Sequence, residues 1–515
     1  MKKFLVILFF ASFIFLFNLD GRTLENQDNM RFAEVGREIL ETGDWIMMHL
    51  SGEIYVDKPP LHFWNMAISY KIFGINTFGA RFPSAFYAII GVAGILFFSY
   101  IADKGNQKTA IYSAFFLLSN YAYIIYARTA RIDIEFSVLF SLSLISFYGG
   151  FIYRKGKRIL LYSLFWFFNG MAFLDKGPVA FIALLIIILF LLINRKAADA
   201  GLKILVFTFT VFILTVIPWI LLLLSHNKFD EYIYMLKTSK IMTRRENFLY
   251  YFYAFPLNFF PVIIFTSITI PFLWKSRKEI YGNSGLVFSI IWFIVYFFVI
   301  HLTSAKNARY LLPIFIPCAF ITAWAIQKIS FRNIYHKTET YCSLIAFIFG
   351  VLISITPLIW IIYKKEFLPN AVILTFIGLI SVFYLHTRLK DFIIFTCILC
   401  IIGFLSADII RTSFNSQLSY NLKLYNLLKD KNIKADEILL YKTDPEVRKK
   451  LSFYFNKLLT QRDEIPSLSA NTKVIITSPA FLDNILKIAG DKSSYFKIKN
   501  REGQEELDVY AVFIK

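Results

Sequence analysis

The sequence predicts an α-helical polytopic membrane protein with a small C-terminal soluble α/β domain. Of its 515 residues, 57% are hydrophobic and 18% aromatic, and the mean hydropathy is +0.58; a soluble protein does not carry that much apolar surface. Apolar runs recur up to residue 409, whereas residues 412–515 alternate short apolar and charged segments. The formal charge of +20 does not indicate nucleic acid, because many basic residues stand in short loops where an anionic membrane surface favours them.

The apolar runs predict about thirteen transmembrane helices, at roughly 20 residues per crossing. The first follows Lys2-Lys3, and no small-x-small cleavage site comes after it. We therefore expect an uncleaved span with a cytoplasmic N-terminus. The other expected spans are 84–102, 109–127, 132–152, 159–174, 178–194, 203–224, 251–273, 284–302, 308–326, 341–363, 370–386 and 391–409.

The charges of the loops predict the orientation of these spans. With the N-terminus inside, alternate loops should be rich in Lys and Arg, and an odd number of spans places residues 412–515 on the outer side. The basic loops hold Lys104 and Lys108, Arg154 to Arg158, Arg195 and Lys196, Lys275 to Lys278, Lys328 to Lys337, and Arg388 and Lys390.

The first outer loop, 19–83, is a long polar interruption with two expected interfacial helices. One is the amphipathic segment Asn29–Glu41, and Asp28 stands at its N-cap position. The other begins after Pro59-Pro60, because prolines favour a helix start, and it runs to Phe73. Lys58 is then held at the membrane surface. From the residues alone, Asp28 is more simply a helix cap than a catalytic acid.

Charged residues also stand in the other outer turns, where the positive-inside rule gives no reason for basic side chains. These turns are Ala127–Asp133, Leu174–Pro178 and Ser304–Tyr310. A structural Arg–Asp ion pair could explain the charges of one such turn. It does not easily explain the charges of all of them. Lys and Arg gathered on the outer side are suited to a lipid-linked phosphate, which Arg binds with two hydrogen bonds and Lys as a point charge.

Several of these segments together resemble a known family. Asp28 with Arg31-Phe32, then Gly43-Asp44-Trp45, Gly52-Glu53 and Asp57-Lys58-Pro59-Pro60-Leu61…Trp64, resembles the first periplasmic loop of the bacterial lipid A aminoarabinose transferases. More broadly, the pattern is similar to the protein O-mannosyltransferase-like, C-type membrane glycosyltransferases. The ARTARID segment at 127–133, the DKGP turn at 175–178 and the SAKNARYLLP segment at 304–313 follow in the family's order. The resemblance covers residues 1–330 well and the rest only in architecture.

The resemblance implies an enzyme of the bacterial inner membrane that acts on its periplasmic face. Its donor would be a polyprenyl-phosphate sugar, and its acceptor lipid A, a glycan or a protein. Residues 1–411 would form the transmembrane glycosyltransferase domain and 412–515 a periplasmic domain. Asp28 and Asp133 match the catalytic acidic positions. The candidates for binding phosphate are Arg31, Lys58, Arg128, Arg131, Lys176, Lys306 and Arg309.

The same family bears on metal binding. In the aminoarabinose transferases a Glu before Lys-Pro-Pro can join a later His on a metal, whereas this chain has Asp57 there and no His near Glu246. The sequence therefore assigns no cofactor and leaves a divalent metal open, with Asp57 and Glu246 as the candidate ligands for a hard cation. His49, His62 and His301 are expected to be interface or packing residues.

Two other functions fit many spans with charged residues: a lipid or glycolipid transporter or flippase, and a structural polytopic subunit. A transporter is expected to carry charges within its spans, broken helices at the midplane or repeated halves. Here the unexplained charges stand at span ends on one side. This pattern favours an enzyme that acts on lipid substrates at the membrane surface.

Overall fold

The structure of the chain is a computed structural model. Two expected spans, 341–363 and 370–386, lie outside its continuously described residues. The structure describes residues 2–24, 27–154, 156–194, 201–238, 247–303, 306–329, 392–418, 420–462, 472–489, 493–498 and 509–514, with isolated positions between 351 and 379.

The chain divides into two compact units, and each unit combines segments that are distant in the sequence. The helical unit consists of Met1–Leu19, Asp57–His62 and Phe82–Ile410. The mixed unit consists of Asp20–Val56, Phe63–Arg81 and Arg411–Lys515. Most of the first outer loop thus groups with the C-terminal segment, whereas we expected it to accompany the spans. The functional division at residue 411 stays a prediction.

The described residues contain six helical runs that are long and apolar enough to cross a membrane, or eight if each bent pair is one span. The bent pairs are α5 (Gln107–Leu118) with α6 (Tyr121–Ala127), at 67°, and α13 (Tyr250–Asn258) with α14 (Val262–Lys275), at 111°. The six runs are α4 (Thr77–Ala102); α7 (Ile132–Ile152); α8 (Gly156–Lys176) through η1 (Gly177–Phe181) to α9 (Ile182–Ile193); α10 (Leu202–Phe207) with α11 (Phe209–Ser225); α16 (Ser284–His301); and η3 (Ala308–Ile314) with α17 (Phe315–Lys328).

Shorter helices complete the described part of this region. The first span is represented by α1 (Lys2–Leu16), and the last contains the apolar run Ile393–Asp408 within α20 (Phe392–Leu418). Two more helices, α12 (Phe229–Thr238) and α15 (Arg277–Gly282), stand between spans. The mostly helical, polytopic architecture is therefore as predicted, while the number thirteen stays a prediction.

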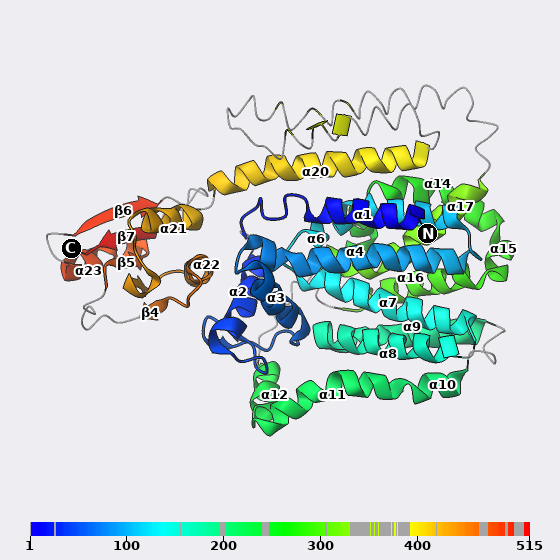
Figure 1. Ribbon diagram of the computed structural model, residues 1–515, viewed down its shortest axis with the longest axis horizontal. Coiled ribbons are helices and arrows are strands. Elements are labelled where there is room, and N and C mark those ends of the chain that lie inside the picture. The colour runs from blue at the N-terminus through cyan, green and yellow to red at the C-terminus, as the bar shows by residue number, and fades with distance from the viewer. Residues whose placement is uncertain are drawn as a thin grey trace. The chain divides into compact units, whose positions relative to one another are not determined.

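The run Gly156–Ile193 reverses direction at η1. The ring of Phe147 lies 6.0 Å from that of Phe165 and 6.4 Å from that of Phe190. A straight helix would place the latter two about 37 Å apart, so α8 and α9 must fold back on each other, as Figure 1 shows. Gly177 has a φ of 72° in that turn, a conformation that costs glycine little. The reversal matches the two expected spans 159–174 and 178–194.

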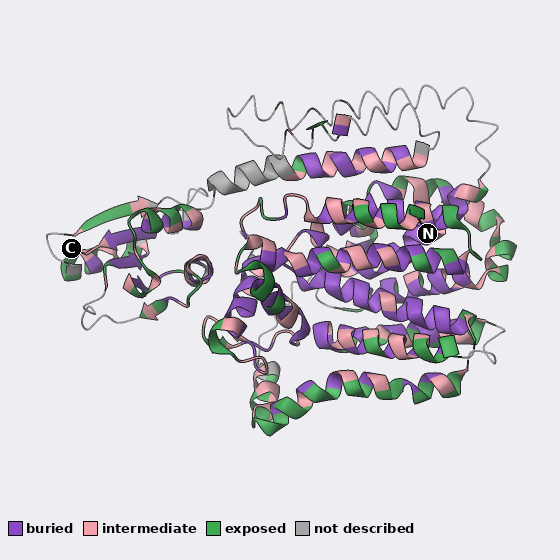
Figure 2. Ribbon diagram, in the orientation of Figure 1, coloured by how far each residue is buried: buried purple, intermediate pink, exposed green. Residues whose placement is uncertain are grey.

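The helix α7 forms the centre of the helical unit. In its apolar window 94% of the residues are buried, against 28% for the run Leu202–Ser225; Figure 2 shows this contrast as a purple α7 and a largely green and pink α11. Large apolar side chains of α11, among them Leu214 and Leu221, are exposed on the surface of the described protein. Lipid chains would cover such a surface.

The C-terminal part of the mixed unit is built around a five-stranded sheet of order β4-β3-β5-β7-β6. The strands β4, β3 and β5 are parallel, and β7 and β6 continue the sheet antiparallel. Leucines of α21 and α22 pack on one face beside Leu440, and Ile485 of α23 packs on the other beside Leu439, because neighbouring strand residues face opposite sides. The bounds are α21 (Tyr420–Asp430), β3 (Ile438–Tyr441), α22 (Pro445–Phe455), β4 (Thr460–Arg462), β5 (Val474–Thr477), α23 (Leu482–Ala489), β6 (Ser494–Ile498) and β7 (Val509–Phe513).

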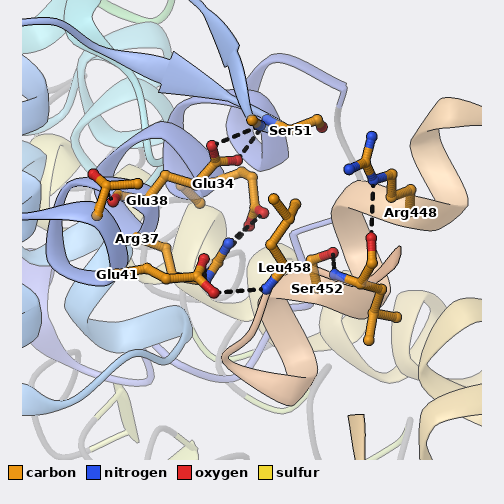
Figure 3. A network of polar contacts seen from close by, with 12 residues as sticks. Glu34, Arg37, Glu38, Glu41, Ser51, Arg448, Ser452 and Leu458 are labelled. Atoms are coloured by element: carbon orange, nitrogen blue, oxygen red, sulfur yellow. Dashed lines mark hydrogen bonds and ion pairs between the residues drawn. The ribbon is translucent and has the colours of Figure 1, made fainter. Parts of the chain in front are cut away.

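The first outer loop contributes α2 (Gln27–Thr42) and α3 (Leu61–Phe73). The expected apolar stripe of α2 is buried, but Glu34, Arg37 and Glu38 are buried as well. Arg37 donates hydrogen bonds to both oxygens of Glu34, at 2.9 Å each, and to Glu41 at 2.7 Å (Figure 3). Burial raises the pKa of Glu34 to about 7 in spite of these hydrogen bonds. The charged side of α2 therefore lies against protein, and its interfacial position stays a prediction.

Two contacts of this charged side connect α2 to other segments of the mixed unit (Figure 3). Glu38 accepts hydrogen bonds from the backbone N–H of Ser51 and of Gly52, the latter at 2.9 Å. These residues form the turn between β1 (His49–Leu50) and β2 (Glu53–Ile54). Glu41 accepts a hydrogen bond of 3.1 Å from the backbone N–H of Leu458, which follows α22.

Candidate functional site

The carboxylate of Asp133 lies among three basic side chains in the helical unit. Its Oδ1 is 2.9 Å from Nζ of Lys176, and its Oδ2 is 3.1 Å from Nε of Arg131 and 3.4 Å from Nε of Arg309. The side chain of Asp133 is 2% exposed. Since a buried carboxylate needs opposite charge to offset its lost hydration, this arrangement is stable. It brings three basic side chains to one place. We call these four residues the basic cluster.

Local structure explains why three separate turns meet in the basic cluster. Arg131 is the N-cap of α7, and Asp133 stands in its first turn, where the helix dipole favours negative charge. Lys176 ends α8 just before the reversal at η1. Arg309 stands at the start of η3, where the side chain of Asn307 accepts a hydrogen bond from its backbone N–H. The three turns that carried unexplained charges in the sequence therefore converge.

Aromatic rings line the cationic side of the basic cluster. Nζ of Lys176 lies 4.6 Å from the ring centroid of Tyr310 and 5.2 Å from that of Phe136. The guanidinium of Arg309 lies 5.6 Å from the ring of Tyr310. Cation–π contacts of this kind hold a basic group in one direction at modest desolvation cost. These contacts therefore orient the ammonium group of Lys176 and the guanidinium group of Arg309.

Arg128 is positioned differently from the other predicted phosphate-binding residues. It is 2% exposed, and Nη1 donates to the carbonyl oxygens of Ile14 at 2.8 Å and Phe15 at 3.3 Å. Its Nη2 donates to the carbonyl of Asn18 at 3.2 Å and to Oδ2 of Asp408 at 3.0 Å. These contacts satisfy the last turn of α1 and favour a structural role for Arg128.

Two further predicted residues of the helical unit make local contacts. Nζ of Lys306, which is buried, donates to the carbonyl of Thr303 at 3.0 Å. Nζ of Lys58 donates to the carbonyl of Asp57 at 2.9 Å and is 3.4 Å from its Oδ1. Lys58 keeps 29% of its side chain exposed, so its ammonium group can reach a ligand.

Asp28 and Arg31 belong to the mixed unit and pair with each other. Nη2 of Arg31 donates to Oδ1 of Asp28 at 2.9 Å, and the side chains are 31% and 28% exposed. Asp28 stands in the first turn of α2, where the N-terminal dipole stabilises its charged form. The guanidinium of Arg31 lies 5.2 Å from the ring of Phe32 and 5.9 Å from that of Tyr55. A partly exposed carboxylate with a fixed direction is suited to accept a proton.

The predicted metal candidates are not brought together by the described residues. The carboxylate of Asp57 has the ammonium group of Lys58 as a partner, and Glu246 lies outside the described residues. Within the described part of the chain, a set of metal-type ligands occurs elsewhere, at His62, Glu135 and Asp175. Sequence reasoning missed this set. Its signal was present, because an acidic residue inside an apolar span is costly and needs a reason.

The fold and the basic cluster define a polytopic membrane protein with a phosphate-compatible site at the ends of its spans. Residues 57–221 match the model of the family described as dolichyl-phosphate-mannose-protein mannosyltransferase. This range includes Lys58, Arg131, Asp133 and Lys176. It does not extend to Asp28 or Arg309.

Particular relatives agree with this class. A protein of Aquifex aeolicus described as uncharacterized is 27% identical over 343 residues, 65% of this chain and 66% of that protein. The undecaprenyl phosphate-α-4-amino-4-deoxy-L-arabinose arabinosyl transferase of Photorhabdus laumondii is 28% identical over 327 residues, 62% of this chain and 58% of that enzyme. The alignments thus span less than two thirds of these relatives.

A solved structure matches almost the whole chain. It is the crystal structure of ArnT from Cupriavidus metallidurans bound to undecaprenyl phosphate, with a TM-score of 0.74 at 18% identity over 98% of this chain and 97% of that one. At this identity the likeness shows the fold. Together, the comparisons confirm the predicted resemblance to the aminoarabinose transferase and protein O-mannosyltransferase-like membrane glycosyltransferases.

Proposed function

We propose that this chain is an inner-membrane glycosyltransferase that moves a sugar from a polyprenyl-phosphate donor to an acceptor on the periplasmic face. The acceptor is lipid A, a glycan or a protein. The names of the similar arabinosyl transferases support a polyprenyl-phosphate donor. The acceptor and the side of the membrane are parts of the proposal.

The basic cluster is the observation that carries the proposal. One carboxylate faces three basic side chains, those of Arg131, Lys176 and Arg309. Basic side chains gathered at span ends are suited to bind an anion. A phosphate diester or the departing phosphate of a lipid carrier supplies that anion and matches the guanidinium group of Arg309.

In the proposed reaction an acceptor hydroxyl attacks the anomeric carbon of the donor sugar. The bond between that carbon and the phosphate oxygen breaks, and the polyprenyl phosphate leaves with the electron pair. Asp28 accepts the proton of the hydroxyl, in the role that the family resemblance gives to its position. Arg131, Lys176 and Arg309 stabilise the charge that develops on the phosphate.

A lipid transporter or flippase is not favoured. The charged residues of the basic cluster stand at the start of α7, the end of α8 and the start of η3, which are ends of apolar runs and not their middles. A transporter would need its substrate site near the midplane. The comparisons likewise name sugar transfer and not transport.

The test is a transfer assay with purified protein, candidate undecaprenyl-phosphate sugars and isolated acceptors, with products identified by mass spectrometry. Asp28→Asn should abolish transfer, because the amide cannot take the proton, and should leave membrane insertion intact. The matched control is Glu53→Gln, an exposed acid of the same loop, which should keep full activity. Transfer that survives in Asp28→Asn would remove the catalytic role of this residue.

A further inference from the structure

Three ligand-type side chains are buried together in the helical unit, apart from the basic cluster. They are His62 at the start of α3, Glu135 in the first turn of α7 and Asp175 near the end of α8. Each is 0% exposed. One ligand atom from each lies within 4.8 Å of the other two. We call these residues the buried triad.

The carboxylate of Asp175 is the part of the buried triad whose charge has no hydrogen-bond donor among the described residues. Nδ1 of His62 lies 3.1 Å from Oε1 of Glu135, so these two side chains face each other. Neither oxygen of Asp175 accepts a hydrogen bond from any residue that the structure describes. Its sequence neighbour Lys176 is directed to Asp133 instead. A fully buried carboxylate without donors is costly unless a proton or a cation joins it.

We propose that the buried triad binds a divalent transition-metal cation. One imidazole nitrogen and two carboxylate oxygens suit Zn²⁺ or Mn²⁺ better than Mg²⁺, which prefers oxygen and water. With metal–ligand bonds of about 2.0–2.2 Å, the ligand atoms of a tetrahedral site stand about 3.3 Å apart. Side-chain movements of about 1 Å would bring the triad to that spacing. The cation would cancel the two carboxylate charges.

The position of the triad gives the cation a structural role. Glu135 follows Asp133 by two residues, and Asp175 immediately precedes Lys176, so two ligands are adjacent in sequence to members of the basic cluster. His62 follows Lys58-Pro59-Pro60 by two residues. A cation held by all three would tie the start of α3 to α7 and α8. It would thereby fix the backbone that carries Lys58, Asp133 and Lys176.

The test measures metal directly and does not depend on the proposed transfer reaction. The full chain is purified in detergent with its affinity tag removed, and its metal content is determined by elemental mass spectrometry. We expect about one equivalent of Zn²⁺ or Mn²⁺ per chain. Removal with a chelator should lower the thermal unfolding temperature, and adding back Zn²⁺ or Mn²⁺, but not Mg²⁺, should restore it.

Variants then assign the site. Asp175→Asn and Glu135→Gln should each lower metal affinity at least about tenfold and abolish the thermal recovery. Asp408→Asn, which changes an acid of the same unit outside the triad, should bind metal as the wild type does. The proposal is overturned if chelator-treated wild type shows no calorimetric binding of Zn²⁺ or Mn²⁺, or if Asp175→Asn binds as tightly as wild type. The wild-type titration decides the matter even if a variant does not fold.

Discussion

Arg309 and Arg128 show how the same side chain can serve two purposes in one unit. Arg309 is directed to a carboxylate that it shares with two other cations. Arg128 gives its donors to backbone carbonyls at the end of α1 and to Asp408. Only the first arrangement gathers basic side chains from three turns, as a phosphate-binding site would.

We therefore predict that Arg309→Ala raises the KM for a polyprenyl-phosphate donor by about tenfold to a hundredfold. A charged hydrogen bond contributes about 1.5–3 kcal/mol, and about 1.4 kcal/mol corresponds to a factor of ten. Arg128→Ala should instead lower the thermal unfolding temperature and leave the donor KM unchanged. Steady-state kinetics and thermal melting in detergent check both variants. A donor KM that rises in Arg128→Ala would return this residue to the phosphate-binding set.

At the scale of single elements, the turn between β1 and β2 depends on α2. Ser51 and Gly52 have φ values of 57° and 83°, the positive values that a two-residue hairpin turn requires. Serine is strained in this region, whereas glycine is not. Glu38 holds the turn by accepting both backbone N–H groups.

Glu38→Gln is predicted to lower the free energy of unfolding by about 1–3 kcal/mol, because the backbone N–H groups of the turn lose a charged acceptor. Ser51→Gly is the opposite control. It should leave stability unchanged or raise it by up to about 1 kcal/mol, since it relieves the positive φ. Denaturant or thermal unfolding of the purified protein measures both. Equal stabilities for Glu38→Gln and wild type would show that these hydrogen bonds contribute nothing net.

Local patterns allowed the sequence to predict much of the helical architecture. The predicted helix Asn29–Glu41 lies within α2, although Asp28, the predicted N-cap, stands inside its first turn, and the Gly-Pro pair at 177–178 marks the reversal between α8 and α9. The positive-inside rule, applied to the loops, assigned Arg131, Lys176 and Arg309 to the same side of the membrane. Each of these patterns involves residues that are close in the sequence, so a single sequence is enough to recognise them.

Long-range packing was beyond the reach of the same patterns. Arg128 was predicted to bind phosphate. Its hydrogen-bond partners, Ile14 and Asp408, are distant in the sequence, so no local pattern indicated these contacts. The segment that forms α2 was expected to be an amphipathic interfacial helix, and no local pattern revealed that Glu34, Arg37 and Glu38 are buried. His62 was expected to be an interface or packing residue. Glu135 and Asp175 are distant from it in the sequence and come close to it only in the folded unit, so the sequence did not reveal this group.

For the whole molecule, the alternation of basic loops predicts the orientation in the membrane. The basic loops predict a cytoplasmic N-terminus, and an odd number of about thirteen spans would then put the C-terminal segment in the periplasm. Alkaline phosphatase fused after the last residue should be active, whereas a fusion in the basic loop at 154–158 should be inactive. A fluorescent protein that matures only in the cytoplasm should give the reverse pattern. Phosphatase activity at 154–158 would invert the predicted topology.

The hydrogen bond between Glu41 and Leu458 joins residues that are 417 positions apart, and it has a consequence for biosynthesis. A ribosome that adds about 5–20 residues per second needs about 20–80 seconds to proceed from the first of these residues to the second. During that interval α2 has been made, but the segment that covers its charged side has not. Glu41 therefore cannot accept this hydrogen bond until residue 458 has been made, and late synthesis becomes the step at which this contact of α2 is completed.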